Sequence, residues 1–252
     1  MRIAIITAME EEITPFRSQA QITARTQVGK VIIEEAVYRG QSLILVESGI
    51  GKVNAAVATT LLIERYQPDL ILNSGSAGAF GAGLSVGNVV VATQYIYGDV
   101  DATCFGYEPG QVPQMPASYD LDAALLDQAR RVAAAAELQY SLDFGLVLTL
   151  DSFMSEPERV ERIKSTFPAA KVSDMEGLGI VQAAAQYGIP VLAVKAVSDI
   201  AGQGGVTANS FDDNLDAVAA HAAHFTDLLI QQLQSGLSKS ITFLGRDSSR
   251  LT

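Results

Sequence analysis

Cysteine and histidine are scarce in this sequence, which contains one Cys, Cys104, and two His, His221 and His224. A single cysteine cannot build an internal disulfide framework, and it fits a protein of the reducing cytoplasm. Cys104 has no apparent histidine partner, so we do not expect it to act as a nucleophile. The two histidines fall in one turn of a predicted helix, and we interpret both as ordinary helix residues.

Positive charge and long apolar runs are also scarce. Lys and Arg total 17 against 28 Asp and Glu, and the net charge of −11 would repel nucleic acid and anionic lipid, so neither is expected as a partner. No apolar stretch is long enough to span a bilayer, and the first one is short and followed at once by acids. We therefore expect neither a membrane segment nor a secretory signal. The 252 residues are 48% hydrophobic, which is enough for a sizeable globular core.

Alternating strand-like and helix-like patterns place the chain in the α/β class. Helical patterns lie between several of the short apolar runs, which predicts a mostly parallel sheet covered by helices on both faces. A hairpin-like pair at 30–39 and 42–47 predicts that the sheet is mixed. No linker divides the chain, so we predict one domain over residues 1–234, with a polar and loosely held tail over 235–252. The expected strands are 3–8, 43–46, 70–72, 89–92, 146–148 and 191–194, and the expected helices are 53–66, 121–138, 155–167, 175–187 and 211–233.

Three acids stand near the ends of predicted strands or at the helix starts that follow. Glu12 ends a run of three acids after the first strand, Glu176 opens a helix, and Asp199 follows the strand at 191–194. Each acid alone has an ordinary explanation as a helix-start charge or a turn residue. However, the carboxyl ends of parallel strands converge on one edge of a sheet, where ligands bind. Three acids in one apolar cleft would perturb each other's proton affinity, which is typical of a functional site.

Two glycine-rich segments, 48–52 and 73–79, also follow predicted strands. Neither matches the phosphate loop or the dinucleotide fingerprint, so each alone is interpreted as a tight turn. A metal site is the rival explanation for the three acids, but they lack the D-x-D or His/Asp patterns common at such sites, and no metal is expected. Residues 95–119 form a long aromatic segment without a predicted element, which indicates an interface or a substrate lid.

Seven segments, in order along nearly the whole chain, resemble the 5′-methylthioadenosine/S-adenosylhomocysteine nucleosidases of the nucleoside phosphorylase superfamily. The resemblance implies a single-domain three-layer α/β/α sandwich with a twisted mixed sheet, and a homodimer. It also implies hydrolysis of the N-glycosidic bond of a 5′-substituted adenosine, without a cofactor. The segments that carry it are 9–12, 48–56, 73–78, 105–108, 151–153, 174–176 and 198–201.

The resemblance also implies roles for individual residues. Glu12 would activate the attacking water, Asp199 would donate a proton to N7 of adenine, and Glu176 would bind a ribose hydroxyl. The remaining contacts would come from substrate-binding residues on the same chain and from Ala102 and Phe105 of the partner subunit. The implied substrate-binding residues are Met9, Ile50, Ser76, Phe153, Met154, Met175, Ser198, Ala201 and Phe211.

Two other functions remain open. Related bacterial phosphorylases carry an arginine where this sequence has Asn73, and no arginine lies between Arg65 and Arg130. Phosphate needs fixed positive charge, usually arginine, so water is favoured over phosphate as the nucleophile. A non-catalytic nucleoside-binding or storage protein is the alternative from another class, and the presence of all three acids argues against it.

Three positions depart from the family's usual pattern. Lys195 stands where arginine is common, and lysine keeps the charge but loses the two-pronged hydrogen bonding. Gly98 stands where histidine is common, and Ala102 is smaller than the usual aliphatic residue, which would widen the pocket for the 5′ group. The preferred substrate therefore stays open, and 5′-deoxyadenosine and aminodeoxyfutalosine are further candidates.

Overall fold

The computed structural model describes residues 1–81, 83–202 and 208–244, and in the last helix it describes the side chains from 214 to 234. The strands are β1 (Ile3–Thr7), β2 (Ala20–Val28), β3 (Val31–Tyr38), β4 (Gln41–Glu47), β5 (Leu70–Ala79), β6 (Val89–Tyr97), β7 (Tyr119–Asp120), β8 (Leu142–Thr149), β9 (Ala170–Asp174) and β10 (Val191–Ile200). The helices are α1 (Glu10–Arg17), α2 (Lys52–Tyr66), α3 (Ala123–Ala135), α4 (Pro157–Thr166), α5 (Gly177–Gln186) and α6 (Ala208–Leu244), with a short 3₁₀ helix, η1 (Thr103–Phe105).

The strands form one mixed sheet in the order β10-β6-β8-β9-β5-β1-β4-β3-β2, with β7 on β6. An additional pairing between β10 and β5 closes five strands into a ring. β1 pairs in parallel with β4 and β5, and β5 pairs in parallel with β10. The pairings of β10 with β6, of β5 with β9 and along β2-β3-β4 are antiparallel. The prediction of a mixed sheet is therefore confirmed.

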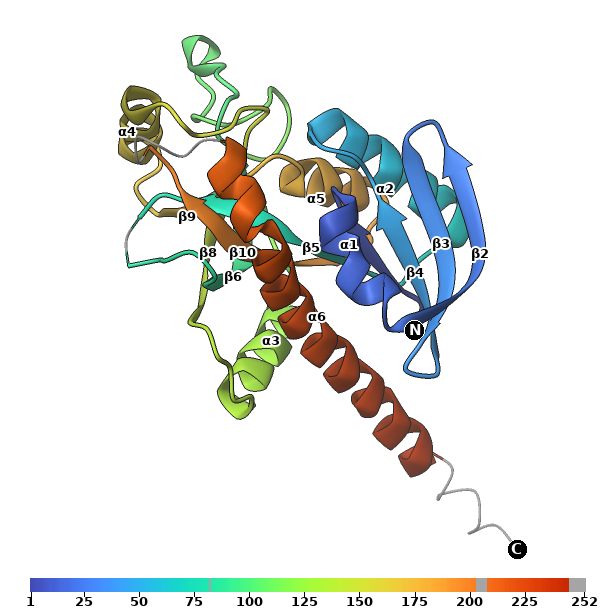
Figure 1. The fold of residues 1–252 in the computed structure, drawn as a ribbon. Helices are drawn as coiled ribbons and strands as arrows, with labels where there is room; N and C mark the ends of the chain where they lie inside the picture. Colours follow the sequence, from blue (N-terminus) through green and yellow to red (C-terminus); the bar gives the residue numbers. More distant parts are fainter. Residues whose placement is uncertain (82, 203–207, 245–252) are drawn as a thin grey trace, which may run out of the picture.

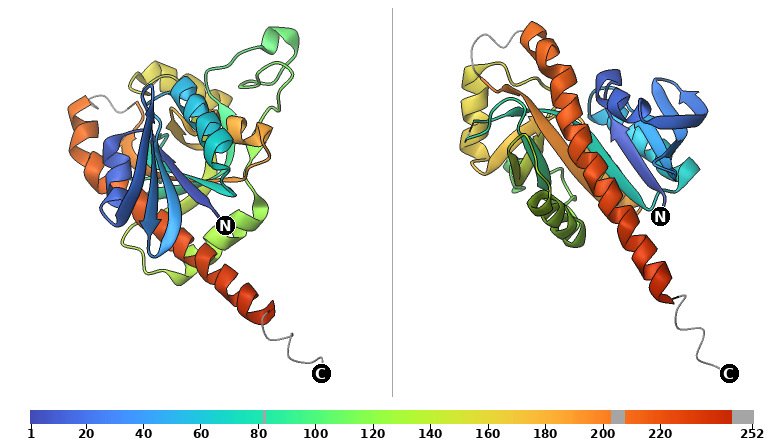
Figure 2. Two further views of the ribbon diagram at one scale, coloured as in Figure 1. Left: turned by 90° about the vertical axis from the view of Figure 1, so that its right-hand side faces the viewer. Right: turned by 60° about the horizontal axis from the view of Figure 1, so that its bottom comes forward.

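Helices cover the sheet in two pairs, α1 with α6 and α2 with α5. Figures 1 and 2 show these pairs on opposite sides of the sheet, which gives the three layers of the predicted sandwich. The sequence explains the packing of α2, because its buried residues recur at helical spacing and form one apolar stripe. They are Ala55, Ala58, Thr59, Leu62 and Ile63. Across the described ranges, no helix is long and apolar enough to cross a membrane.

Several elements differ from the sequence prediction. The segment 73–79 is not a tight turn, because β5 continues through it to Ala79. β10 likewise runs past its expected end to Ile200. Three strands were missed: β2 is largely exposed, so it lacks an apolar alternation, and β7 and β9 are short.

Helix α6 is longer than the predicted 211–233, since its backbone remains helical to Leu244. Figures 1 and 2 show its C-terminal end projecting beyond the sheet and the other helices. The predicted tail at 235–252 thus overlaps the helix, and its loose attachment stays a prediction. In the aromatic segment 95–119, β6 ends at Tyr97 and η1 carries the exposed Cys104.

Candidate active site

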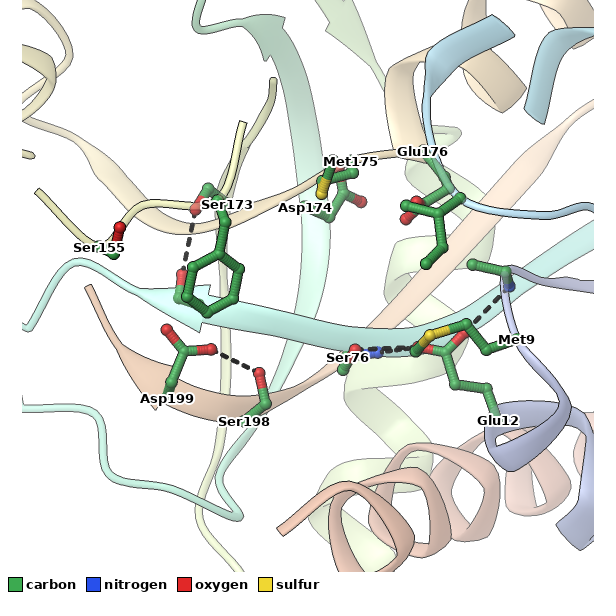
Figure 3. A pocket seen from close by; sticks show the side chains of 14 residues that line it. Met9, Glu12, Ser76, Ser155, Ser173, Asp174, Met175, Glu176, Ser198 and Asp199 are labelled. Carbon is green, nitrogen blue, oxygen red and sulfur yellow. Dashed lines mark hydrogen bonds between the residues drawn. The ribbon is translucent and has the colours of Figure 1, made fainter. Parts of the chain in front are cut away.

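A cavity of about 400 Å³ opens at the carboxyl ends of β1, β5, β9 and β10. Figure 3 shows Asp199 at one end of the cavity, with Glu12 and Glu176 toward the other. The three acids were predicted to meet at one edge of the sheet, and all three line this cavity. The cavity is lined by Ala8, Met9, Glu12, Ile50, Ser76, Gly78, Phe153, Ser155, Ser173, Asp174, Met175, Glu176, Ser198 and Asp199.

Glu12 is held in the cavity by three donors. Its Oε1 accepts hydrogen bonds from the backbone N–H and the hydroxyl of Ser76, at 2.8 and 2.9 Å. Its Oε2 accepts one from the N–H of Ala8, at 2.9 Å. The side chain comes from the first turn of α1 and is buried. All three partners are donors, so the Glu12 carboxyl group is oriented as an acceptor at the cavity.

Two glycines of β5 make room for the acids. A Cβ added at Gly75 would lie 2.9 Å from Oε1 of Glu12, and one added at Gly78 would lie 3.0 Å from Oδ2 of Asp199. A Cβ at Gly75 would be closer than real side chains come and one at Gly78 would be tighter than most contacts, so a larger residue at either position would displace the carboxyl group. The glycines in segment 73–79 therefore serve close approach rather than a turn.

Asp199 lies on β10 in an environment that favours its protonated form. The residue is only 5% exposed, and burial raises the pKa of its carboxyl group. A hydrogen bond of 2.7 Å from the Ser198 hydroxyl to Oδ1 partly offsets the effect of burial on the pKa. Asp199 can therefore keep a proton at a pH where an exposed carboxyl group would have lost it.

Glu176 stands directly before α5 and faces the same cavity. Burial raises its pKa to about 7, and the nearby charges of Asp174 and Glu12 add to this effect against the opposing charge of Lys195. Its Oε1 accepts a 2.9 Å hydrogen bond from the N–H of Gly51, in the second glycine segment. A carboxyl group that is half protonated near neutral pH can bind a hydroxyl group either as acceptor or as donor.

Lys195 and Asp174 form a buried ion pair behind the three acids. The Nζ–Oδ2 distance is 2.9 Å, and the two side chains are 2% and 0% exposed. Burial opposes the charged form of Lys195, but Asp174, Glu176 and Glu12 together raise its pKa. Oδ1 of Asp174 also accepts a 2.6 Å hydrogen bond from Thr149, and the N–H of Gly177 in the first turn of α5 points at the same carboxylate. The pair thereby fixes the start of α5, from which Glu176 projects.

We expect Lys195→Met to lower the free energy of unfolding by ~3–5 kcal/mol, because it leaves the buried charge of Asp174 without its partner. Lys164→Met is the matched control, since the Lys164–Glu161 pair is exposed. Its free energy of unfolding should change by no more than ~0.5 kcal/mol. Chemical denaturation of both variants measures the difference, and equal stabilities would contradict a structural role for the pair.

The structure brings most of the predicted substrate-binding residues to the cavity. Met9, Ile50, Ser76, Phe153, Met175 and Ser198 all line it. Met154 and Ala201 are instead buried beside it, where the carbonyl group of Met154 accepts a hydrogen bond from Gly202. The side chain of Phe211 lies outside the described residues.

Sequence reasoning did not single out Ala8, Gly78, Ser155, Ser173 or Asp174 as lining residues. Asp174 could have been found, because it belongs to the same Asp-Met-Glu segment as Glu176. The two residues predicted for the partner subunit lie on the aromatic segment and do not line the cavity of their own chain. Ala102 is buried, whereas Phe105 is 80% exposed on η1.

Comparisons with known proteins agree with this geometry. The sequence-family model of the phosphorylase superfamily matches residues 2–231 of this chain. A 5′-methylthioadenosine/S-adenosylhomocysteine nucleosidase of Geobacillus sp. (strain WCH70) is 42% identical over 234 residues, which cover 93% of this chain and 100% of the relative.

Two solved structures extend the likeness to three dimensions. The crystal structure of the Neisseria meningitidis nucleosidase of the same name, in complex with methylthio-immucillin-A, has a TM-score of 0.86 at 38% identity and covers 91% of this chain and 98% of that chain. Futalosine hydrolase of Helicobacter pylori has a TM-score of 0.85 at 28% identity, with coverages of 92% and 98%. This chain therefore belongs to the phosphorylase superfamily and, within it, to the 5′-methylthioadenosine/S-adenosylhomocysteine nucleosidases.

Proposed function

We propose that the protein hydrolyses the N-glycosidic bond of 5′-methylthioadenosine and S-adenosylhomocysteine, releasing adenine and the 5-substituted ribose. The observation that carries the proposal is one cavity with a buried Asp199 at one end, where burial raises its pKa, and the carboxyl groups of Glu12 and Glu176 toward the other. The names of the relatives, all at about 40% identity over nearly the whole chain, support the same substrates.

The residue types suit the charges that develop during this reaction. Breaking the bond builds positive charge on the sugar and negative charge on the departing base. Asp199 donates its proton to N7 of adenine, so the base leaves as a neutral molecule. Glu12 takes a proton from water as the water oxygen bonds to the sugar carbon, and its negative charge stabilises the sugar cation. Glu176 binds a ribose hydroxyl group and holds the sugar between Asp199 and Glu12.

The other predicted residues give the cavity its selectivity. Phe153 stacks on the adenine ring, with backbone groups of Phe153 and Met154 near its edge. Met175 packs against the sugar, and Ser76 lies close to the sugar and the water. Met9, Ile50 and Phe211 are assigned to the pocket for the sugar and the 5′ group. Ser198 and Ala201 complete the set of substrate-binding residues.

Water rather than phosphate is the proposed nucleophile. Among the described residues that line the cavity, none is an arginine or a lysine, and four are acids. Asn73, at the position where phosphorylases carry arginine, is buried, and its Nδ2 donates to the carbonyl group of Ile6. A phosphate dianion would therefore meet negative charge without a cation to bind it.

The test is adenine release from 5′-methylthioadenosine in phosphate-free buffer, with the sugar product identified by chromatography. We expect adenine and free methylthioribose at a rate that added phosphate does not change. Release only with phosphate, as a sugar 1-phosphate, would instead assign the chain to the phosphorylases. Tight adenine binding without turnover would indicate a nucleoside-binding protein. Parallel assays with 5′-deoxyadenosine and aminodeoxyfutalosine would rank the 5′ groups.

We also propose a cytoplasmic homodimer in which Ala102 and Phe105 of the partner subunit complete the site. The exposure of Phe105 supports this, as do two exposed valines, Val53 and Val57, one turn apart on α2. Sedimentation at several protein concentrations should show a dimer, and Phe105→Asp should raise KM. A monomer with full activity would contradict the proposed contribution of the partner.

A further inference from the structure

The strand that carries Asp199 contains an irregularity directly before it. Val197 of β10 is in register with Ala77 of β5, and Asp199 is in register with Gly78, so Ser198 is an extra residue. Successive side chains of a regular strand point to opposite faces. Ser198 and Asp199 nevertheless both line the cavity. This β-bulge therefore aims the Asp199 carboxyl group into the site.

A tight turn holds the residue that precedes the bulge. The regular pairing of β10 with β6 ends at Ala196 and Val89. Beyond it, the N–H of Gly87 donates to the carbonyl group of Val197, and the N–H of Val197 donates to the carbonyl group of Asn88, both at 2.8 Å. Val197 is therefore fixed on the β6 side by two main-chain hydrogen bonds and on the other side by β5.

His221 of α6 binds this turn through the carbonyl group of Gly87. Its Nδ1 lies 2.8 Å from the carbonyl oxygen of Gly87, so this nitrogen carries the proton and donates it. The imidazole ring stacks on Tyr140, with 4.7 Å between centroids and 29° between planes. Gly87 has φ +87°, a backbone conformation that L residues rarely adopt, so glycine suits this turn.

We propose that His221 is a positioning residue for the acid Asp199. It acts through a chain of main-chain contacts, from its Nδ1–H to Gly87, from Gly87 to Val197, and through the bulge to Asp199. His221 does not line the cavity, so any effect on catalysis must pass through this chain. The inference rests on the proposed hydrolysis, in which Asp199 protonates the leaving base.

Three variants separate the hydrogen bond from the packing. His221→Phe keeps a ring against Tyr140 but cannot donate to Gly87, and His221→Leu serves as a second variant without a donor if the larger ring disturbs folding. His221→Asn places an amide N–H near the position of Nδ1 and should restore the contact. His224→Leu is the control, because His224 also contacts Tyr140, through a 2.9 Å hydrogen bond, whereas the contact with the Gly87 carbonyl group is made by His221.

The measurement compares two substrates, 5′-methylthioadenosine and 4-nitrophenyl 5-methylthioriboside. Nitrophenolate departs without a proton, so only the adenine substrate needs a well-placed acid. We expect His221→Phe to lower kcat for the adenine substrate by ~10–100-fold, the cost of misplacing a catalytic group by about 1 Å. KM should stay near the wild-type value, and kcat for the nitrophenyl substrate should change by less than about threefold on the same grounds. Asp199→Asn should also lose activity on the adenine substrate alone, by the larger factor expected when the acid is removed, and it calibrates the assay.

His221→Asn and His224→Leu should behave like the wild type on both substrates. An equal loss on both substrates in His221→Phe and His221→Leu would indicate a purely structural role and overturn the inference. So would full activity in both of these variants, with melting temperatures that show folded protein. A wild-type enzyme that releases nitrophenolate but no adenine would overturn the proposed function instead, and the inference with it.

Discussion

Asp199→Asn is expected to lower kcat for adenine release by ~10²–10⁴-fold, the usual contribution of a general acid. Asparagine has nearly the same shape as aspartic acid and can still accept the hydrogen bond from Ser198, so the fold should persist. It has no acidic proton, and the base would have to leave as an anion.

The dependence of kcat on pH tests the same role. Because burial raises the pKa of Asp199, the acid stays protonated to a higher pH than an exposed aspartic acid would, and the rate should fall as the pH rises through that raised pKa. This alkaline fall should be absent in Asp199→Asn. Asp127→Asn, on the exposed side of α3, is the control and should keep both the rate and the fall. Unchanged activity in Asp199→Asn, with the alkaline fall retained, would remove the acid from the mechanism.

Glu12→Gln should reduce kcat by at least ~10²-fold, because an amide cannot take the proton from water. The change also disturbs the hydrogen bonds that hold the side chain. Both oxygens of Glu12 accept from N–H groups, those of Ser76 and Ala8, so the amide NH₂ must face one of them. A buried donor left without an acceptor costs ~1–3 kcal/mol, and the variant should be less stable by about that amount.

Glu11→Gln provides the comparison for Glu12→Gln. Glu11 lies in the same turn of α1 but is exposed, so its replacement should alter neither kcat nor the free energy of unfolding. Steady-state kinetics and urea denaturation of both variants supply the two numbers. If Glu12→Gln kept wild-type turnover, the water would have to be activated by another group.

The sequence was sufficient to predict the class of fold and the three acids, because both depend on local patterns. Apolar runs mark β1, β5 and β10, Glu12 and Asp199 stand near the ends of two of these runs, and Glu176 opens a predicted helix. The family resemblance then gave each acid a role. The exposed strand β2 was missed because its side chains do not alternate between apolar and polar.

Other parts of the site depend on long-range contacts that no local pattern records. Gly75 and Gly78 indicated a turn, yet they lie inside β5, where the space above them is taken by Glu12 and Asp199. The bulge at Ser198 exists only because β10 pairs with β5 in a shifted register. His221 looked like an ordinary helix residue, since its contact with Gly87 joins segments far apart in the chain.

The closed ring of strands has a consequence for how the chain folds during its synthesis. β10 is the last strand among the described residues, yet it lies between β5 and β6, which are made much earlier. Pairings between distant segments form slowly, because the chain must close a long loop before any contact stabilises it. A growing chain could therefore arrange Glu12 and Ser76 while still lacking the strand that brings Asp199. A chain without β10 lacks Asp199 at the cavity, so we expect catalysis to begin only after this strand has paired with β5 and β6.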